Sequence, residues 1–302
     1  MKVSFKFIFN TVCFLSLTSC LDMSQLEKSK EIKDSSILLL QIKGLILSDL
    51  SQNFAKHVRK YASQERVKGV LIRVDSPGGS VAASQEINSA IFEIVDRYKK
   101  PVYVSGGDVV ASGGVYSIMS ASKIFVNAGT LFGSIGVIST FRNLSELARW
   151  AKVEIYNLKA GEFKDAGNSF RKMTFREREL FENLLETVHD QFKQAVITGR
   201  KLDPEAVEFF ADGRIFSGAE GVEFGLADQV GTFNDAIREI GEKTGLGSNP
   251  TLFDPDEKTS FERFFENFSS KGKVFSSFFS KWNELESLSG KPLYLLQTYV
   301  TH

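Results

Sequence analysis

Ser112 stands in a run of small residues, ASGGVY at 111–116, directly after an apolar stretch. This pattern predicts a junction between a strand and a helix. A serine at such a junction can be an exposed nucleophile, and it can equally cap the first turn of the helix. The two roles are compatible, so Ser112 is the first candidate for covalent chemistry.

A second glycine-rich segment, DSPGGS at 75–80, also lies between a predicted strand and a predicted helix. Paired glycines let the backbone approach a ligand closely, and the N–H groups at a helix start can bind an anion. The segment lacks the Lys-Ser/Thr pair of a phosphate-binding loop and the spaced glycines of a dinucleotide motif. The alternative is a tight turn that binds no ligand.

A serine nucleophile needs a general base, and the chain contains only three histidines, His57, His189 and His302. The first two fall within predicted helices and the third is the last residue, which disfavours a Ser-His-Asp triad. A lysine can replace histidine when burial lowers its pKa. The residue types alone do not select one of the lysines that are near in sequence, namely Lys123, Lys152, Lys159 and Lys164.

Short apolar runs alternate with segments of helical composition through the body of the chain. Strands are predicted at 37–42, 69–75, 101–104, 123–126, 135–138 and 153–158, and helices at 52–64, 81–98, 111–121, 144–151, 174–199 and 233–243. The longest helix begins with a capping box that pairs Thr174 with Glu177. The repeated β–α order predicts an α/β fold with a mainly parallel sheet.

The composition narrows the class of protein. The chain has 302 residues, 42% of them apolar, and its 37 Lys+Arg balance its 37 Asp+Glu. Such a chain is neither disordered nor a multi-span membrane protein, and its charge gives no reason to expect a nucleic-acid partner. Its two cysteines exclude a disulfide scaffold and an all-cysteine metal site, and we expect no metal and no other cofactor.

The N-terminus has the features of an export signal. Lys2 and Lys6 flank the start of a mostly apolar run at 7–17, which is shorter than the roughly 20 residues that a spanning helix needs. The sequence LTSC at 17–20 resembles the bacterial lipobox, whose cysteine, here Cys20, is lipidated. We therefore expect a signal peptide or an uncleaved anchor at 1–19 and a polar tether at 20–35. Either form places the rest of the chain outside the cytoplasm, attached to a membrane.

Several ordered motifs resemble those of the bacterial signal peptide peptidase A family of serine proteases. They are DSPGG (75–79), ASGGVY (111–116), GTLFGSIGV (129–137), GEFKDAG (161–167), RKMT (171–174), RIFSG (214–218) and GLAD (225–228). The resemblance spans about residues 36–245. It implies a protease domain over that range, with a crotonase/Clp-protease-like α/β core.

The same resemblance implies a Ser–Lys dyad with Ser112 as the nucleophile and Lys164 as the general base. It implies that Ser134 orients the lysine amine. It also implies that the backbone N–H groups of Gly79 and Gly113 form the oxyanion hole, because two donors must converge on one developing charge. The spacing of the dyad fits the short, single-core form of the family.

Two acidic residues, Glu162 and Asp165, flank the predicted base. Nearby carboxylates favour the charged form of a lysine, and a general base must be neutral. The predicted dyad therefore requires both carboxylates to point away from the Lys164 amine.

The implied function is that of a membrane-attached endopeptidase of the bacterial cell envelope. Its expected substrates are cleaved signal peptides and other unfolded segments, and its expected assembly is a homo-oligomeric ring. Two alternatives remain from the residues themselves: a crotonase-like enzyme acting on an acyl-CoA, and a non-catalytic envelope scaffold with the same fold. Export away from the CoA pool disfavours the first, and intact Ser112 and Lys164 disfavour the second.

Residues 246–302 form a predicted helical extension that is rich in aromatic side chains. Two sets repeat the spacing i, i+3, i+4, i+7, namely Phe261, Phe264, Phe265 and Phe268, and then Phe275, Phe278, Phe279 and Trp282. This spacing places each set on one face of a helix. We expect these faces to pack against the core or a neighbouring subunit, and the alternative is contact with a membrane surface.

Overall fold

The computed structural model describes residues 31–257 and 291–295. Contacts divide the chain into two units, 1–33 and 34–302, and the sheet with its helices belongs to the second. The predicted signal or anchor at 1–19, Cys20 and the two aromatic sets of the C-terminal extension lie outside the described residues. Among the helices that are described, none combines the length and the apolar character required to cross a membrane.

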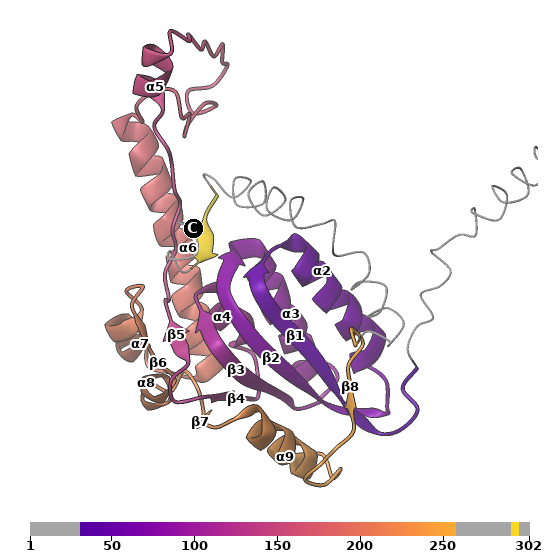
Figure 1. Ribbon diagram of the computed structural model, residues 1–302. Coiled ribbons are helices and arrows are strands. Elements are labelled where there is room, and N and C mark those ends of the chain that lie inside the picture. The colour runs from indigo at the N-terminus through magenta and orange to yellow at the C-terminus, as the bar shows by residue number, and fades with distance from the viewer. Residues whose placement is uncertain (1–30, 258–290, 296–302) are drawn as a thin grey trace, which may run out of the picture. The chain divides into compact units, whose positions relative to one another are not determined.

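The strands of the described residues join in one mixed sheet (Figure 1). They are β1 (Ser36–Ile46), β2 (Val67–Ser80), β3 (Val102–Ala111), β4 (Lys123–Val126), β5 (Leu131–Gly133), β6 (Ile215–Ser217), β7 (Gln229–Val230), β8 (Leu252–Phe253) and β9 (Leu293–Leu295). The main order is β6-β5-β3-β2-β1-β8, and β4, β7 and β9 pair outside this path. Within these residues, β5–β6 and β2–β9 are antiparallel and the other pairs are parallel. The predicted α/β fold with a mainly parallel sheet is confirmed.

Helices connect and cover the strands. They are α2 (Ser48–His57), which continues as the π-helical turn η2 (Val58–Ala62), then α3 (Val81–Asp96), α4 (Gly113–Ile118), α5 (Ser145–Trp150), α6 (Phe175–Arg200), α7 (Pro204–Phe210), α8 (Gly218–Glu223) and α9 (Phe233–Lys243). On one face of the sheet, Ala236 and Ile240 of α9 pack in a cluster with Ile37, Leu71 and Phe125. Strands that are covered in this way are nearly continuous apolar runs, as the sequence of β1 is.

The long helix α6 has two different halves. Its start carries the predicted capping box, in which Thr174 and Glu177 bond each other's backbone N–H groups. Val188, Phe192 and Val196 in its second half are buried, whereas most of its first half is exposed. Figure 1 shows the first half projecting beyond the sheet, with α5 at its outer end. We call residues 139–186 the arm.

Two predicted strands do not form. Residues 153–158 lie on the arm without strand structure, and Leu158 is fully exposed. A strand needs a neighbour to bond its backbone, and no strand of the described residues runs along the arm. Residues 135–138 form only an isolated bridge between Ile138 and Leu293, and the strand of this region, β5, lies just before them.

The glycine-rich segment at 75–80 also differs from expectation. It is not a turn but the extended end of β2, which runs to Ser80 and passes directly into α3. Gly78 and Gly79 still pair with Leu45 and Ile46 of β1. The two glycines that could approach a ligand therefore belong to the end of a strand and not to a turn.

Candidate active site

Ser112 joins β3 to α4 and has a strained backbone. Its φ is 52° and its ψ is −114°, a region that non-glycine residues rarely adopt. Its N–H donates to the Gly133 carbonyl at 2.8 Å, and its carbonyl accepts the Tyr116 N–H at 3.0 Å. A serine on a strained strand-to-helix turn is the usual form of a nucleophile elbow in α/β hydrolases. The side chain is almost completely buried, with a residue exposure of 1%.

The structure brings the two glycine segments against each other. A Cβ added at Gly113 would stand 3.1 Å from the backbone nitrogen of Gly79, and one added at Gly78 would stand 2.7 Å from the nitrogen of Gly113. On its other side Gly79 packs so closely on Ile46 that a Cβ there would overlap the Ile46 carbonyl oxygen. The N–H groups predicted for the oxyanion hole thus belong to neighbouring segments beside Ser112.

Ser134, the second serine of the predicted site, also lies beside Ser112. It is 8% exposed and has a φ of 53°, and its N–H donates to the Arg214 carbonyl at 2.7 Å. The preceding residue, Gly133, accepts the Ser112 N–H. The Ser112 N–H is therefore bonded to the peptide group that joins Gly133 to Ser134, so the two serines are close in space. Both have strained backbones of the kind that clusters at functional sites.

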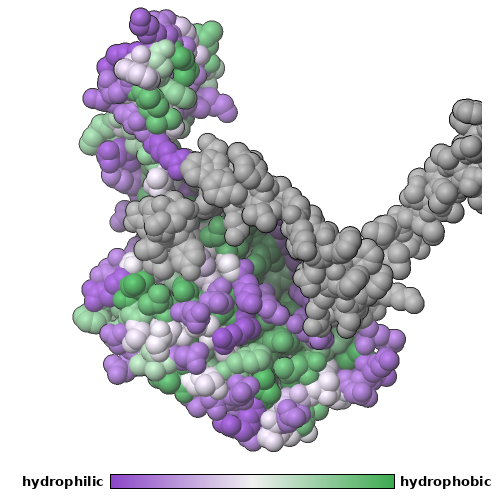
Figure 2. Space-filling view, in the orientation of Figure 1, coloured by the Kyte–Doolittle hydropathy of each residue, from purple (hydrophilic) through white to green (hydrophobic). Residues whose placement is uncertain are grey.

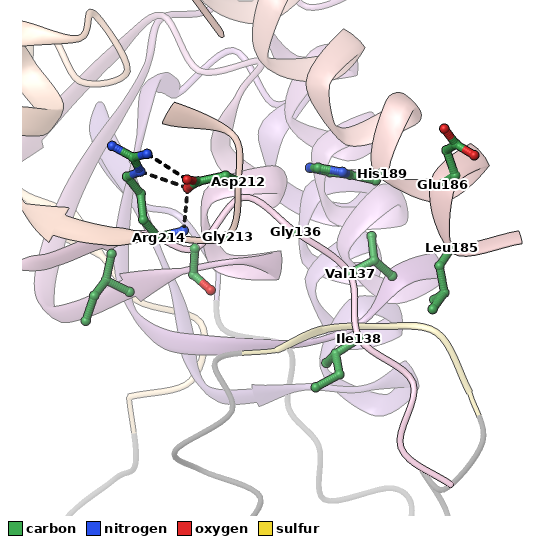
Figure 3. A pocket seen from close by; sticks show the side chains of 11 residues that line it. Gly136, Val137, Ile138, Leu185, Glu186, His189, Asp212, Gly213 and Arg214 are labelled. Carbon is green, nitrogen blue, oxygen red and sulfur yellow. Dashed lines mark hydrogen bonds and ion pairs between the residues drawn. The ribbon is translucent and has the colours of Figure 1, made fainter. Parts of the chain in front are cut away.

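A cavity of about 680 Å³ opens beside Ser134. Figure 3 shows His189 of α6 pointing into this space, opposite the loop of Asp212, Gly213 and Arg214. The Asp212 carboxylate accepts two bonds from the Arg214 guanidinium, at 2.8 and 2.7 Å, which lower the pKa of that carboxyl to about 2. His189 Nε2 lies 3.2 Å from the Ile135 carbonyl oxygen, so this ring nitrogen is already engaged by the backbone.

Lys164 lies on the arm, between α5 and α6, and is exposed. Its neighbour Asp165 is joined through Arg171 to Glu177 in the first turn of α6. The Ser112 region meets the same helix at Phe192, whose ring is 5.2 Å from that of Tyr116. Phe192 is fifteen positions after Glu177 in the helix, which is about 22 Å along the axis. Within one chain, the structure does not bring Lys164 to Ser112.

The carboxylates that flank Lys164 have other partners. Asp165 accepts Lys159 Nζ at 2.5 Å and Arg171 Nε at 3.1 Å, and these two cations hold the pKa of its carboxyl well below the usual range. Glu162 pairs with Arg176 at 2.6 Å. Both negative charges are thus compensated by cations other than Lys164.

Arg171 links the loop that carries Lys164 to the start of α6. It donates to Asp165 and to Glu177, which is 3% exposed, and it also contacts the Asp165 and Lys172 carbonyls. The guanidinium lowers the pKa of Glu177 to about 2. This clamp was not predicted from the sequence. The RKMT motif next to the capping box was the available signal.

Strand β9 is the second feature that was not predicted from the sequence. It pairs with residues 78–80 of β2, at the predicted oxyanion hole. The apolar run LYLL at 293–296 was its signal, but it lies far along the sequence from every strand that it could join. Within residues 31–257 and 291–295, no three His, Cys, Asp or Glu side chains gather in a way that could hold a metal ion.

A strained serine on a strand-to-helix turn, beside two glycine backbones that approach each other closely, defines a candidate site for acyl transfer. The sequence profile of peptidase family S49 matches residues 95–247. The chain belongs to peptidase family S49, and it is a serine-type peptidase.

Relatives share much of the chain. A protein of Synechocystis sp. that is provisionally named a protease is 34% identical over 86% of this chain and 95% of its own length. A protein of Enterococcus faecium, provisionally named signal peptide peptidase SppA, is 34% identical over 70% of this chain and 61% of its own. Protease 4 of Haemophilus influenzae is 28% identical over 68% of this chain and 34% of its own.

A solved structure also resembles this chain. It is a ClpP1 mutant from Listeria monocytogenes, with a TM-score of 0.45 and 19% identity. The match covers 66% of this chain and 93% of the ClpP1 chain.

Proposed function

We propose that this peptidase is an endopeptidase of the bacterial cell envelope that cuts cleaved signal peptides and other unfolded segments. Its nucleophile is Ser112, and its general base is Lys164 of a neighbouring copy of the chain. The observation that carries the proposal is the strained Ser112 beside the converging backbones of Gly79 and Gly113. The resemblance to signal peptide peptidases supports the substrate class.

The chemistry follows from these groups. The neutral Lys164 amine takes the Ser112 proton while the serine oxygen bonds to a peptide carbonyl carbon, and the negative charge on the carbonyl oxygen is stabilised by the Gly79 and Gly113 N–H groups. The tetrahedral intermediate collapses, the C–N bond breaks, and Lys164 returns the proton to the leaving amine. Water then attacks the acyl-enzyme with the same base, releasing the acid and restoring Ser112.

The exposed apolar residues of the arm support a base that is supplied by a second copy. They are Leu147, Trp150, Val153, Ile155, Tyr156, Leu158, Phe163 and Phe170, each at least 37% exposed. Figure 2 shows hydrophobic side chains at the outer end of the arm, over α5. Patches of this kind mark interaction sites. Covering this face with a neighbouring copy would also bury Lys164, and burial is what a lysine needs in order to be neutral at ordinary pH.

Ser134 completes the proposed constellation. It follows Gly133, whose carbonyl accepts the Ser112 N–H, and it lines the cavity. Its hydroxyl could there accept a hydrogen bond from the Lys164 amine of the neighbouring copy and orient that amine. The N-terminal signal with Cys20, or an uncleaved anchor, would attach the assembly to the membrane. We propose a closed homo-oligomeric ring. The arm of one copy would contact a different surface, the Ser112 region, of the next copy, and such a head-to-tail contact forms a ring when the rotation between copies closes.

Active-site labelling tests the assignment. A fluorophosphonate probe should label wild-type protein at Ser112, leave Ser112→Ala unlabelled, and label Lys164→Ala slowly, because the serine then has no base. A matched control is Lys152→Ala, which removes another exposed lysine of the arm. Casein hydrolysis should follow the labelling. Labelling of Lys164→Ala at the wild-type rate would contradict the dyad, and labelling at a residue other than Ser112 would contradict the nucleophile.

A further inference from the structure

A second cavity, with a volume of about 530 Å³, lies in the arm. Its walls come from residues 139–143, which lead from β5 toward α5, and from residues 167–178, which lead from α5 into α6. Figure 1 shows the outgoing segment running along α6. The rings of Phe141 and Phe181 lie 4.5 Å apart, so the outgoing segment packs directly on the helix. The cavity therefore lies at a junction between two parts of the arm.

The side chains that line this cavity carry positive charges and no negative ones. Among the described residues, the lining contains no Asp or Glu, and it contains four cations, namely Arg142, Arg171, Lys172 and Arg178. Arg171 is compensated, because it bonds the carboxylates of Asp165 and Glu177. The positive charge that remains belongs to the other three side chains.

Those three cations have weak partners or none. Arg178 lies 3.7 Å from Glu182, and both side chains are exposed, so water screens this pair. Arg142 and Lys172 are exposed, and neither side chain forms an ion pair or a hydrogen bond with another described residue. The cavity thus gathers positive charge that no carboxylate in the described part of the chain neutralises.

Two asparagines add neutral donors to the lining. Asn143 accepts the Ser145 N–H at 3.0 Å, and Asn168 accepts the Phe170 N–H at 2.8 Å. A backbone N–H can only donate, so the amide oxygen of each asparagine must face the backbone. The NH₂ group of each side chain then remains available to donate to a ligand.

Uncompensated cations together with amide donors suit an oxyanion. A phosphate group carries more charge than a carboxylate and offers more acceptor oxygens, and the planar guanidinium of arginine matches it with two parallel hydrogen bonds. The volume lies within the range of small-ligand sites. The positive charge is confined to one cavity of a chain whose total charge is balanced, which favours a single phosphate group over a nucleic acid.

We propose that this cavity binds a phosphate group between Arg142 on one wall and Lys172 and Arg178 on the other. The phosphate is an inorganic ion or the headgroup of an anionic phospholipid, because both present the same chemistry to these cations. Bound there, it offsets their mutual repulsion and bridges the segment after β5 to the start of α6. Arg171, which links the Lys164 loop to α6, lines the same cavity, so bound phosphate also steadies that loop. The binding itself is independent of the proposed peptidase function.

Calorimetric titration of the full chain with inorganic phosphate, at an ionic strength kept constant with chloride, tests the binding. We expect Arg142→Gln and Lys172→Gln each to weaken it about tenfold, because each removes a charged donor to the ligand. Lys152→Gln is the matched control, since it removes an exposed lysine of the arm that does not line the cavity, and it should leave the affinity unchanged. All three side chains are exposed, so the variants should fold as wild type does.

Vesicle binding identifies the source of the phosphate. The probes are vesicles of phosphatidylglycerol and, as a control without net charge, of phosphatidylcholine. A headgroup site predicts sedimentation with the first that Lys172→Gln weakens and Lys152→Gln does not. The same pattern with inorganic phosphate alone supports the inference with a free ion as the ligand. Failure of both probes to bind, or binding that Lys172→Gln weakens no more than Lys152→Gln does, would overturn the inference.

Hydrogen exchange places the bound group. Phosphate should slow amide exchange in residues 139–143 and 167–178 and leave α9 unchanged. Slowing that is equal throughout the chain, or that spares both arm segments, would overturn the assignment to this cavity. None of these measurements needs cutting, and Ser112→Ala should bind phosphate as wild type does. Failure of the proposed peptidase function would therefore leave this inference standing, and loss of phosphate binding would leave the proposed function standing.

Discussion

The backbone of Ser112 is held at a positive φ by a hydrogen bond on each side of the residue. Such a conformation costs of order 1–3 kcal/mol in a residue with a side chain. We therefore predict that the free energy of unfolding of Ser112→Gly is about 1 kcal/mol higher than that of Ser112→Ala. The glycine variant is the more stable one because glycine adopts positive φ with little strain. Both variants lack the proposed nucleophile. Urea unfolding measures the difference, and equal midpoints at equal slopes would contradict the strain.

Gly113 has no room for a side chain. A Cβ there would stand 2.5 Å from Ser84 Oγ and would also crowd the Gly79 nitrogen. Gly113→Ala should therefore shift a proposed donor of the oxyanion hole and lower kcat about a hundredfold or more. Gly129→Ala is the matched control, because a Cβ at that position meets nothing within 4 Å. Casein hydrolysis by both variants checks the prediction, and similar rates would show that the Gly113 N–H is not a donor in the reaction.

At the scale of elements, the clamp of Arg171 on Glu177 fixes the start of α6 to the loop that carries Lys164. Because Arg171 and the cap lower the Glu177 pKa from 4.5 to about 2, the ionised carboxylate stabilises the folded state above pH 4.5. That contribution is lost as the pH falls toward 2. We predict that wild type exceeds Glu177→Gln in unfolding free energy at pH 6, and that the difference shrinks between pH 4.5 and 2.

Unfolding by urea at several pH values measures this difference. Glu179→Gln is the control, since Glu179 is an exposed acid near the same end of α6, whereas the Arg171 guanidinium bonds Glu177. Its difference from wild type should stay small throughout. A Glu177→Gln difference that is independent of pH would show that the Arg171 bond is not charge-assisted.

Local patterns predicted most elements but not their long-range partners. The capping box at Thr174 and the apolar runs of β1 and β2 are local signals, and both predictions are confirmed. The run at 153–158 has the composition of a strand, yet it lies exposed on the arm because nothing there pairs with it. Strand β9 shows the converse, since its three residues become a strand only through contact with Gly78–Ser80.

The candidate site was predicted by motif rather than by geometry. Ser112, Ser134, Gly79 and Gly113 are brought together by the ends of β2 and β3 and by the residues after β5, as strand ends in one sheet allow. Lys164 is not brought to this place within one chain, because its loop precedes the half of α6 that projects beyond the sheet. A sequence pattern carries no information about which copy of a chain supplies a residue.

At the scale of the whole molecule, the exposed arm predicts that assembly and activity are linked. Trp150 is 82% exposed and Leu158 is fully exposed. We expect the double substitution Trp150→Glu, Leu158→Glu to shift the protein toward monomer in light scattering and to lower casein hydrolysis in parallel, because charges would be buried at the contact. Phe92→Glu, at a 56% exposed site on α3, is the control. Loss of assembly with full activity would contradict a shared site.

Mixing two inactive variants tests the central claim most directly. Ser112→Ala and Lys164→Ala should each be inactive alone, since each lacks one member of the dyad. Co-expressed in equal amounts, they place an intact Ser112 of one copy beside an intact Lys164 of the next at about a quarter of the contacts in a randomly filled ring. We predict that casein hydrolysis returns to a corresponding fraction of the wild-type rate. Mixed oligomers that stay as inactive as either variant alone would contradict a dyad formed between copies of the chain.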